Sequence, residues 1–594
     1  MKMFIDVIKM YGLIAKFNKK YLILSALYVL LSVIHPFFLL FFLEVLVDGV
    51  LSKGQNMQWL YLGGVLMFLH IAGTCGKVIL DNFVKLNQKA MMIDMSALFC
   101  KKAADMDYEG TENQEILSEM DRASYVLVFG NSWETYLDAI NISLISLGEF
   151  VICLVLISQV PYYFSAAIIL ISFGNILYGL YVQRKNYKLY QREIPLERRW
   201  KYFNQLACDV EYGKTMRIFQ LQDYIRKRGE ENRKEYLRLH KNIIKRDGRK
   251  GLVQNISNTI IEIGMMAVLA YEVIRNIITI GKFTIILNAA KQLASSMTNF
   301  FEGIINLYRN DKYINDFFAF LERPSQLRTS ESVIVGSECE VEAPGRIEFK
   351  NVTFVYPGTS NAILKNINLV IKPGEHLMLV GENGAGKTTS IKLLMRFYDV
   401  TKGEILYNDI NIKEYDYDEY MKYFSTVFQD FHVLDVSTYE NIMFSDADNV
   451  EKRKVADELL KKAGLWERIG NMREKGETVL ARNLDAGGTD LSLGQQQMLA
   501  FVRAVYKNGG TVVMDEPTAS LSSLAESNLY QQFQQLVGNK TAIFISHRLS
   551  SASICDKICV LKEGTVAEYG THNELLKQNG IYAEMYKLQA QYYV

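Results

Sequence analysis

The glycine-rich stretch GENGAGKTT occupies residues 381–389. An apolar run, EHLMLV, ends just before it, and a helix-forming run, SIKLLMRFY, follows it. In this strand–loop–helix context the spacing GxxxxGK[ST] predicts a phosphate loop, because its backbone N–H groups and the helix N-terminus attract phosphate oxygens. We expect Lys387 to reach the β- and γ-phosphates of a nucleotide and the Thr388 hydroxyl to ligate Mg²⁺. The expected nucleotide-binding residues are Gly381, Glu382, Asn383, Gly384, Ala385, Gly386, Lys387, Thr388 and Thr389.

Two carboxylates end another apolar run, GTVVMDEP at 510–517. We expect Asp515 to hold Mg²⁺, directly or through water, and Glu516 to polarise an attacking water molecule as general base. An Asp-Glu pair alone is a weak signal. At the end of a buried strand downstream of a phosphate loop, it specifically indicates phosphoryl chemistry.

A second element suited to anions is LSLGQQQ at 491–497, where Ser492, Gly494 and Gln495 precede or begin a helical run. The N-terminus of such a helix can bind phosphate. The chain therefore contains two phosphate-type elements, and one nucleotide bound to one loop does not account for both.

Composition sets the broad class. The formal net charge of the 594 residues is only +1, so no strong field favours nucleic acid, and we expect no nucleic-acid partner. The seven cysteines form no CxxC pair, which favours scattered reduced thiols over a metal site or a disulfide framework.

Long apolar runs fill the first half of the chain, whereas the second half has the pattern of a soluble α/β domain. We expect six membrane spans, each near the roughly 20 residues that a crossing needs. Lysines and arginines gather before the first span and in two long intervening stretches, which predicts cytoplasmic N- and C-termini. The expected spans are 21–47, 59–80, 133–160, 161–182, 252–274 and 284–308.

The two long intervening stretches have helical periodicity, so we expect the span helices to continue into the cytoplasm. Interruptions at 107–116 and 208–219 predict short transverse helices that touch the soluble domain; ordinary turns without contact are the alternative. Of the ionisable residues inside spans, Glu149 and Glu262 lie nearest mid-span. They are candidates for a polar substrate path, and structural pairing is the alternative.

The fold expected is an α-helical six-span membrane domain with long cytoplasmic helical extensions, followed by an α/β P-loop ATPase domain. A polar, aperiodic segment separates the two halves. The expected domains are residues 1–322 (membrane), 323–344 (linker) and 345–594 (ATPase).

In combination and order, these motifs resemble those of exporter-type ATP-binding cassette (ABC) transporters, over nearly the whole chain. The resemblance implies that Tyr356 stacks on adenine, that Gln429 senses Mg²⁺ and the attacking water, and that His547 contacts the γ-phosphate. It also accounts for the second anion element. In this family two ATPase domains pair head to tail, and the signature LSLGQ of one closes over the nucleotide of the other.

The resemblance implies a dimer of half-transporters, with ATP and Mg²⁺ as cofactors and the lipid bilayer as environment. Two positions depart from the family pattern: Leu493 replaces a signature glycine, and Ser522 replaces an aspartate at the dimer interface. The second departure puts symmetric coupling in doubt and leaves a homodimer or a heterodimer open.

The expected function is ATP-driven export of amphipathic small molecules or peptides by alternating access, in a bacterial plasma membrane. Two alternatives stay open. One is an exporter-shaped importer of a metal chelate, and the other is an ATP-gated channel or sensor without transport. With the first span beginning near residue 21, we expect no N-terminal peptidase domain.

Overall fold

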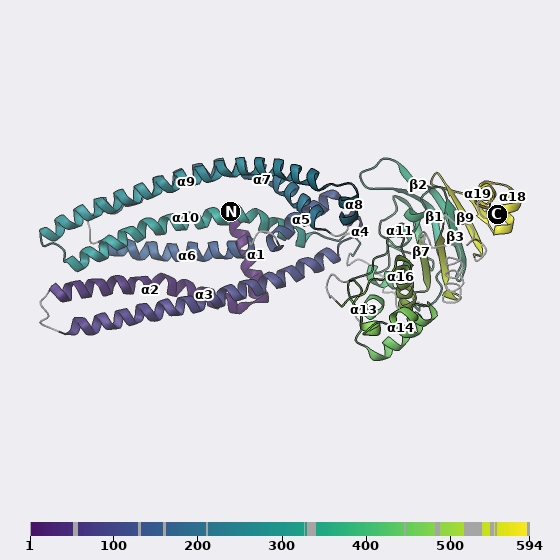
Figure 1. Cartoon of the computed structure of the whole chain (residues 1–594), viewed down its shortest axis with the longest axis horizontal. Helices are drawn as coiled ribbons and strands as arrows, with labels where there is room; N and C mark the ends of the chain where they lie inside the picture. Colours follow the sequence, from purple (N-terminus) through teal and green to yellow (C-terminus); the bar gives the residue numbers. More distant parts are fainter. Residues whose placement is uncertain are drawn as a thin grey trace. The chain divides into compact units, whose positions relative to one another are not determined.

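The computed structural model divides the chain into two compact units (Figure 1). One comprises Met1–Ala104 and Glu115–Arg323, and the other comprises Asp105–Gln114 and Pro324–Val594. Each is described by itself. The residues that the structure describes are 2–51, 57–128, 132–158, 162–209, 212–325, 327–328, 340–444, 447–481, 487–515, 537–546, 552 and 555–590.

The first unit is built of helices, as the long breaker-poor runs of the sequence predict. Several are far longer than a bilayer crossing requires, which agrees with helices that continue beyond their apolar parts. The helices are α1 (Lys2–Phe17), α2 (Lys19–Leu51), α3 (Gln58–Ala104), α5 (Gln114–Val128), α6 (Ser132–Ile157), α7 (Tyr162–Cys208), α8 (Gly213–Ile218), α9 (Gln222–Ile274) and α10 (Ile280–Glu322).

Helices of this unit pack in pairs: α2 with α3, α6 with α10, and α7 with α9 (Figure 1). Helix α10 carries many buried small residues, including Ala289, Ala290 and Ala294. Small side chains let helix backbones approach closely, which is how helices associate where apolar burial offers no net gain. Larger side chains such as Trp133 and Phe317, both fully buried, form the core near the other end of α6 and α10.

Five helices among the described residues are long and apolar enough to cross a membrane: Lys19–Leu51, Gln58–Ala104, Trp133–Ile157, Phe164–Asn186 and Gln222–Ile274. They overlap the first five predicted spans over most of their lengths. The sixth predicted span, 284–308, lies in α10, which is not among the five and carries Lys291 and Glu302 inside that stretch. The sixth crossing therefore stays a prediction.

The second unit contains two sheets. The smaller has the order β2-β1-β4-β5, all antiparallel, and the larger has the order β10-β9-β3-β8-β7-β6. In the larger sheet β9, β3, β8, β7 and β6 run parallel and β10 is antiparallel to β9. The strands are β1 (Ile347–Val355), β2 (Ala362–Ile371), β3 (His376–Gly381), β4 (Lys402–Tyr407), β5 (Ile410–Asn411), β6 (Phe424–Val427), β7 (Thr511–Asp515), β8 (Thr541–Ile545), β9 (Lys557–Lys562) and β10 (Thr565–Gly570).

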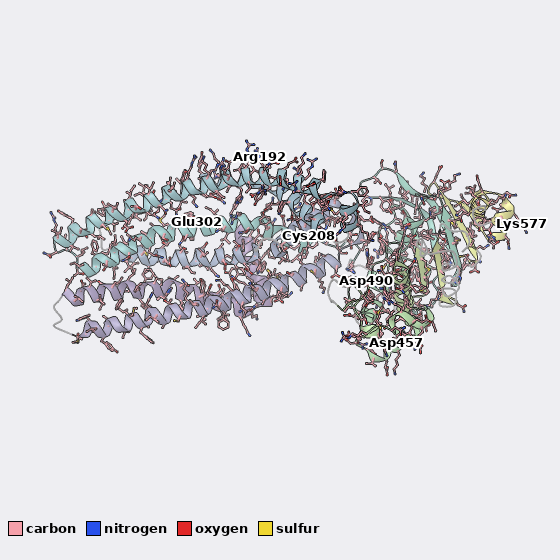
Figure 2. All side chains as sticks on the ribbon, viewed as in Figure 1. Arg192, Cys208, Glu302, Asp457, Asp490 and Lys577 are labelled. Atoms are coloured by element: carbon pink, nitrogen blue, oxygen red, sulfur yellow. The ribbon has the colours of Figure 1, made fainter. Side chains whose placement is uncertain are left out.

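Short helices accompany these sheets, and they carry charged side chains such as Asp457 on α14 and the exposed Lys577 on α18 (Figure 2). Helices α13 to α16 enclose a separate small core around Leu460 and Leu499. The helices are α4 (Tyr108–Glu112), α11 (Lys387–Leu394), α12 (Tyr417–Lys422), α13 (Thr438–Met443), α14 (Val450–Lys462), α15 (Trp466–Ile469), α16 (Leu493–Lys507), α18 (His572–Gln578) and α19 (Ile581–Ala590).

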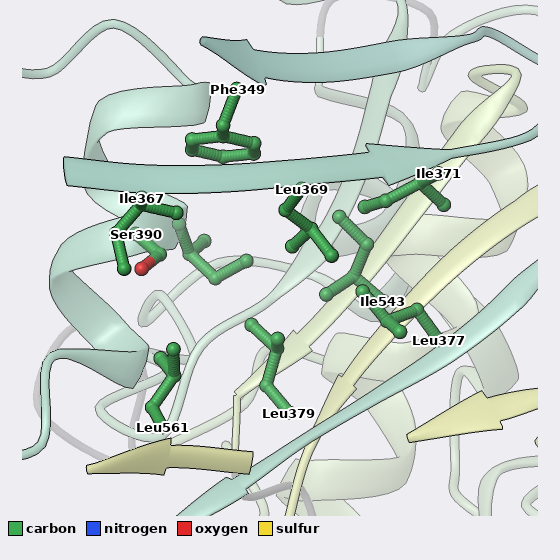
Figure 3. Close-up of a pocket in the computed structure, with 10 residues that line it drawn as sticks. Phe349, Ile367, Leu369, Ile371, Leu377, Leu379, Ser390, Ile543 and Leu561 are labelled. Atoms are coloured by element: carbon green, nitrogen blue, oxygen red, sulfur yellow. The ribbon is translucent and has the colours of Figure 1, made fainter. Parts of the chain in front are cut away.

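The main core of this unit lies between the two sheets and α11 (Figure 3). Phe349 and Leu369 of the smaller sheet face Leu379 and Ile543 of the larger one, and the void left among them measures only about 10 Å³. That is near the smallest space that holds one water molecule, and its lining is mostly apolar. The layer beneath the predicted phosphate loop is thus tightly packed.

A hydroxyl pair also ties the sheets together. Tyr407 at the end of β4 is fully buried, and its hydroxyl lies 3.0 Å from the Thr511 hydroxyl at the start of β7. The Tyr407 ring packs at 5.2–5.8 Å from the rings of Tyr420, Tyr423 and Phe424. Strand β7, which ends at Asp515, is therefore anchored at its beginning.

We predict that Tyr407→Phe lowers the free energy of unfolding of the second unit by about 1 kcal/mol, since it removes one hydrogen bond. Tyr407→Ala is expected to cost about 3–5 kcal/mol, because it also empties the ring site. Thermal unfolding of the purified full chain measures both. Equal losses in the two variants would show that the ring contacts contribute nothing.

Candidate functional site

The predicted phosphate loop connects β3 to α11. β3 is hydrogen-bonded in parallel to β8 on one side and β9 on the other, so the loop leaves the interior of the sheet. Gly386 is the N-cap of α11 with φ +104°, and a Cβ there would lie 2.4 Å from a methyl carbon of Leu364. Only glycine combines that backbone conformation with that close approach. The loop thus brings its backbone to the N-terminus of α11, as the sequence predicts.

Lys387 lies at the first position of α11 and is buried. Its ammonium donates hydrogen bonds to the carbonyl oxygens of Gly381 (2.9 Å) and Glu382 (3.1 Å). The Ser390 hydroxyl donates to the Gly386 carbonyl at 3.0 Å. The charge of Lys387 is therefore held inside the loop, where an anion at the α11 N-terminus would meet it.

The two threonines of the loop differ in environment. Thr388 is exposed in the first turn of α11, whereas Thr389 is buried with its hydroxyl 3.1 Å from the Tyr356 hydroxyl. The Tyr356 ring contacts Phe354 and Tyr398 edge-on, with ring centroids at 4.9 and 5.3 Å. The tyrosine predicted to stack on adenine is thus fixed beside the phosphate loop by its ring and its hydroxyl.

Asp515 and Gln429 follow neighbouring strands. Asp515 is the last residue of β7 and is buried, and Gln429 is exposed two residues beyond the end of β6. β6, β7 and β8 are parallel to each other and β8 is parallel to β3, so these residues emerge at the same edge of the sheet as the phosphate loop. This edge is where open α/β sheets bind ligands.

Three predicted or singled-out residues lie outside the described part of the chain: Glu516, Ser522 and His547. The apolar runs before Glu516 and His547 form the fully buried strands β7 and β8. The roles of Glu516 and His547 stay predictions.

The second anion element begins α16. Ser492 is its N-cap and forms a capping box with Gln495. The Ser492 hydroxyl accepts a hydrogen bond from the backbone N–H of Gln495, and the side-chain Oε1 of Gln495 accepts one from the backbone N–H of Ser492 at 3.0 Å. We did not predict this box, although S-x-x-Q before an apolar run is its sequence signature. The Leu493 side chain, at the departure from the family pattern, is 58% exposed. It therefore projects into solvent and does not disturb the core.

Helix α4 lies within the predicted interruption 107–116 and belongs to the second unit. The Tyr108 ring stacks on Phe397 with centroids 4.6 Å apart and planes 16° apart. The Glu112 carboxylate accepts hydrogen bonds from Lys392 at 2.7 Å and from the Tyr398 hydroxyl. The predicted contact of the 107–116 segment with the soluble domain is confirmed. The corresponding contact of 208–219, which contains α8, stays a prediction.

The hydrogen bonds between α4 and the neighbouring residues set the protonation states of Glu112 and Tyr398. Burial acts to raise the pKa of Glu112, but the hydrogen bonds from Lys392 and the two tyrosines outweigh it and lower the pKa. Burial, then the hydrogen bond to Glu112, raises the pKa of Tyr398. At neutral pH Glu112 is therefore an anion and Tyr398 a neutral donor. The same tyrosine ring touches Tyr356, so the contact extends to the edge of the phosphate loop.

The two candidates for a substrate path have different partners. Glu149 of α6 is buried and accepts a hydrogen bond from the Gln292 amide at 2.8 Å. Glu262 of α9 is partly exposed and forms an ion pair with Lys291 at 2.6 Å. Both partners are consecutive residues of α10. The structure thus links both carboxylates to one turn of α10, and Glu262 has the structural pairing named above as the alternative.

Comparison with known proteins agrees with this geometry. Residues 364–519 match the family model described as "ABC transporter". The subtilin transport ATP-binding protein of Bacillus subtilis is 27% identical over 86% of this chain and 80% of its own length.

Two ATP-dependent lipid A-core flippases are also similar. The Coxiella burnetii protein is 39% identical over 42% of this chain and 41% of its own, and the Escherichia coli K12 protein is 33% identical over 50% and 51%. The chain thus spans about half the length of these flippases or less.

Among solved structures, a bacterial Atm1-family ABC exporter with ATP bound superposes with a TM-score of 0.78 at 21% identity. The match covers 96% of this chain and 99% of that one, so the fold is shared from end to end. The family match contains the phosphate loop and Asp515, the residues that the sheet brings to one edge. Residues 364–519 are thus an ABC transporter domain, and the chain joins this ATPase domain to a unit of long apolar helices in one polypeptide.

Proposed function

We propose that the chain is half of an ATP-driven exporter that moves amphipathic small molecules or peptides across a bacterial membrane by alternating access. The observation that carries the proposal is the ordered phosphate loop in the same polypeptide as five helices of membrane-crossing length and composition. The relatives support it by name: one is a subtilin transport protein, and others are lipid A-core flippases.

A dimer follows from the two anion elements. The phosphate loop and the N-terminus of α16 are separate sites in one domain. In a head-to-tail pair, Ser492, Gly494 and Gln495 of one chain would meet the γ-phosphate of ATP bound by the other. The partner is a second copy or a related half-transporter. Because α16 is 15 residues long with an exposed N-cap, its N-terminal potential is available to such a partner.

Hydrolysis of ATP needs mainly positioning and charge stabilisation. The backbone of Gly384, Ala385 and Gly386 would hold the phosphates, and Lys387 would exchange its carbonyl acceptors for phosphate oxygens. Tyr356 would stack on adenine. Glu516 would accept the proton of the attacking water, and His547 would contact the γ-phosphate.

The residues at this edge also fit Mg²⁺, which prefers oxygen ligands. The exposed Thr388 hydroxyl, the Asp515 carboxylate and the Gln429 amide oxygen are the donors that would hold it. When bound, the ion would neutralise charge on the β- and γ-phosphates. The other steps are carried by the side chains named above.

Helix α4 packs beside the proposed nucleotide site. It lies in the chain between α3 and α5, yet its contacts are with Lys392, Phe397 and Tyr398 of the ATPase unit. Because Tyr398 also holds Tyr356, adenine binding and the position of α4 share one side chain. We propose that this set transmits closure of the ATP site to the helices.

The exporter itself is tested in proteoliposomes that hold the purified chain, with ethidium as an amphipathic cationic probe. ATP-dependent ethidium movement that vanishes in Lys387→Ala supports the proposal. ATP hydrolysis without vectorial movement of ethidium or of an amphipathic peptide would contradict it and favour a gated channel or a sensor.

We predict that Glu516→Gln lowers the ATP turnover about 10²–10⁴-fold, because it removes the general base, while ATP binding persists. Turnover and retained nucleotide measured on the same sample separate the two effects. Glu474→Gln, an exposed carboxylate elsewhere in the domain, is the matched control. Unchanged turnover in Glu516→Gln would refute the assignment.

For α4 we predict that Glu112→Gln and Tyr398→Phe each reduce ethidium-stimulated ATPase activity and leave basal turnover nearly unchanged. Tyr398→Phe removes its hydrogen bond to Glu112, whereas Glu112→Gln weakens that bond and also removes the charge paired with Lys392. The double variant should therefore be no worse than Glu112→Gln alone. Glu109→Gln, which removes the same charge from α4, is the control. Additive losses in the double variant would show that the two residues act separately.

The Glu262–Lys291 pair allows its two interpretations to be separated. Glu262→Gln is expected to lower ethidium-stimulated more than basal ATPase activity, and Glu149→Gln to do the same. The exchange variant Glu262→Lys/Lys291→Glu keeps the pair but moves the carboxylate. It should retain basal activity and lose stimulation if Glu262 contacts the cation. Full ethidium stimulation in the exchange variant would show that the Glu262–Lys291 pair has only a structural role.

A further inference from the structure

A basic pocket of about 540 Å³ lies between α7 and α9. Four cationic side chains come from consecutive turns of α7, and one comes from α9. Arg192 marks its position on α7 (Figure 2). The cations are Arg184, Lys185, Lys188, Arg192 and Arg246.

Among the described residues that line this pocket, none is acidic. Two carboxylates follow lining residues directly in the sequence and have partners of their own: Glu193 bonds the His240 imidazole at 2.9 Å, and Asp247 accepts from the Asn186 side-chain amide at 2.8 Å. The five positive charges thus repel one another without a counter-charge in the lining. An anion in the pocket would relieve that repulsion.

Two of the cations are held in place by neutral groups. Lys185 lies over the Tyr181 ring with its ammonium 4.6 Å from the centroid, and Arg246 donates to the Lys185 carbonyl oxygen at 3.2 Å. These contacts position the Lys185 and Arg246 side chains at the pocket. Because their partners are neutral, the positive charges stay available to a ligand. Arginine and lysine together are the usual recognition set for phosphate.

The pocket begins where the apolar part of α7 ends. That part is Phe164–Asn186, and the cations continue along the same helix to Arg192. From Asn186 to Arg192 the helix rises roughly 9 Å, about the depth of one headgroup layer. Tyr181 lies in the final turns of the apolar part, where amphipathic rings mark the membrane interface.

We infer that this pocket binds the phosphate of an anionic membrane phospholipid. The positive charges of the pocket favour an anionic headgroup. Because the pocket lies at the end of the apolar part of α7, the lipid headgroups are at the same depth as the pocket. The inference rests on the proposed membrane placement of α7 and is independent of ATP hydrolysis and export. It therefore adds a lipid site outside the nucleotide site and outside the Glu149 and Glu262 positions.

The test is lipid binding to the purified full chain in neutral detergent, counted by native mass spectrometry. Phosphatidylglycerol is expected to bind more tightly than phosphatidylcholine. The triple variant Arg184→Gln/Lys188→Gln/Arg192→Gln should lose that preference, with affinity falling about fivefold for each charge removed. The control triple, Lys227→Gln/Arg233→Gln/Lys234→Gln, removes the same charge from exposed positions of α9 and should keep it.

Equal binding of the two lipids to the unmodified chain, or equal loss in both triple variants, would overturn the inference. Displacement of phosphatidylglycerol by millimolar inorganic phosphate would also overturn it, in favour of a soluble phosphate compound. If the triple variant fails to fold, the single variant Arg192→Glu, at an exposed position, is used instead. It should likewise lose the preference for phosphatidylglycerol over phosphatidylcholine. Ethidium transport and ATP turnover are measured separately, so failure of the exporter proposal leaves this result readable.

Discussion

Strand β3 pairs in parallel with β8 and β9, and the geometry of the whole ATPase domain depends on that pairing. The chain leaves β3 through Gly381, where only glycine fits, because a Cβ there would lie 2.3 Å from the Leu561 carbonyl oxygen. It therefore presents its backbone to the N-terminus of α11. The parallel direction of β6 and β7 brings Gln429 and Asp515 to the same edge. One hydrogen-bonded ladder thus assembles residues that are far apart in the sequence.

Features that depend on neighbouring residues were predictable from the sequence. The phosphate loop, the strand before Asp515 and the helix after LSLG follow from local spacing, and each is present. Contacts between distant residues were not. No periodicity indicates that the Tyr356 hydroxyl meets Thr389, or that Tyr398 holds Tyr356 and Glu112 together. Such contacts are decided by tertiary packing, which single-sequence patterns do not encode.

The helical unit shows the same division. Apolar runs predicted the long helices, but they did not show that Glu262 and Glu149 would bind Lys291 and Gln292, neighbours on α10. These polar residues lie in the stretch of α10 that was predicted to span the membrane, and α10 is not among the five helices of membrane-crossing composition. A helix that supplies partners to carboxylates of neighbouring helices carries polar groups of its own. The hydropathy signal of a helix is therefore weak where the helix supplies polar partners to its neighbours.

The grouping of α4 with the ATPase unit bears on how the chain is made. Glu112 and Lys392 are 280 residues apart in the sequence, so α4 leaves the ribosome long before its partners exist. At about 5–20 residues per second, the wait is roughly 15–60 s. During that time the Tyr108 ring has no stacking surface. Completion of the C-terminal domain thus finishes the folding of a segment from the N-terminal half, and a fault in either is expected to appear as premature degradation of the other.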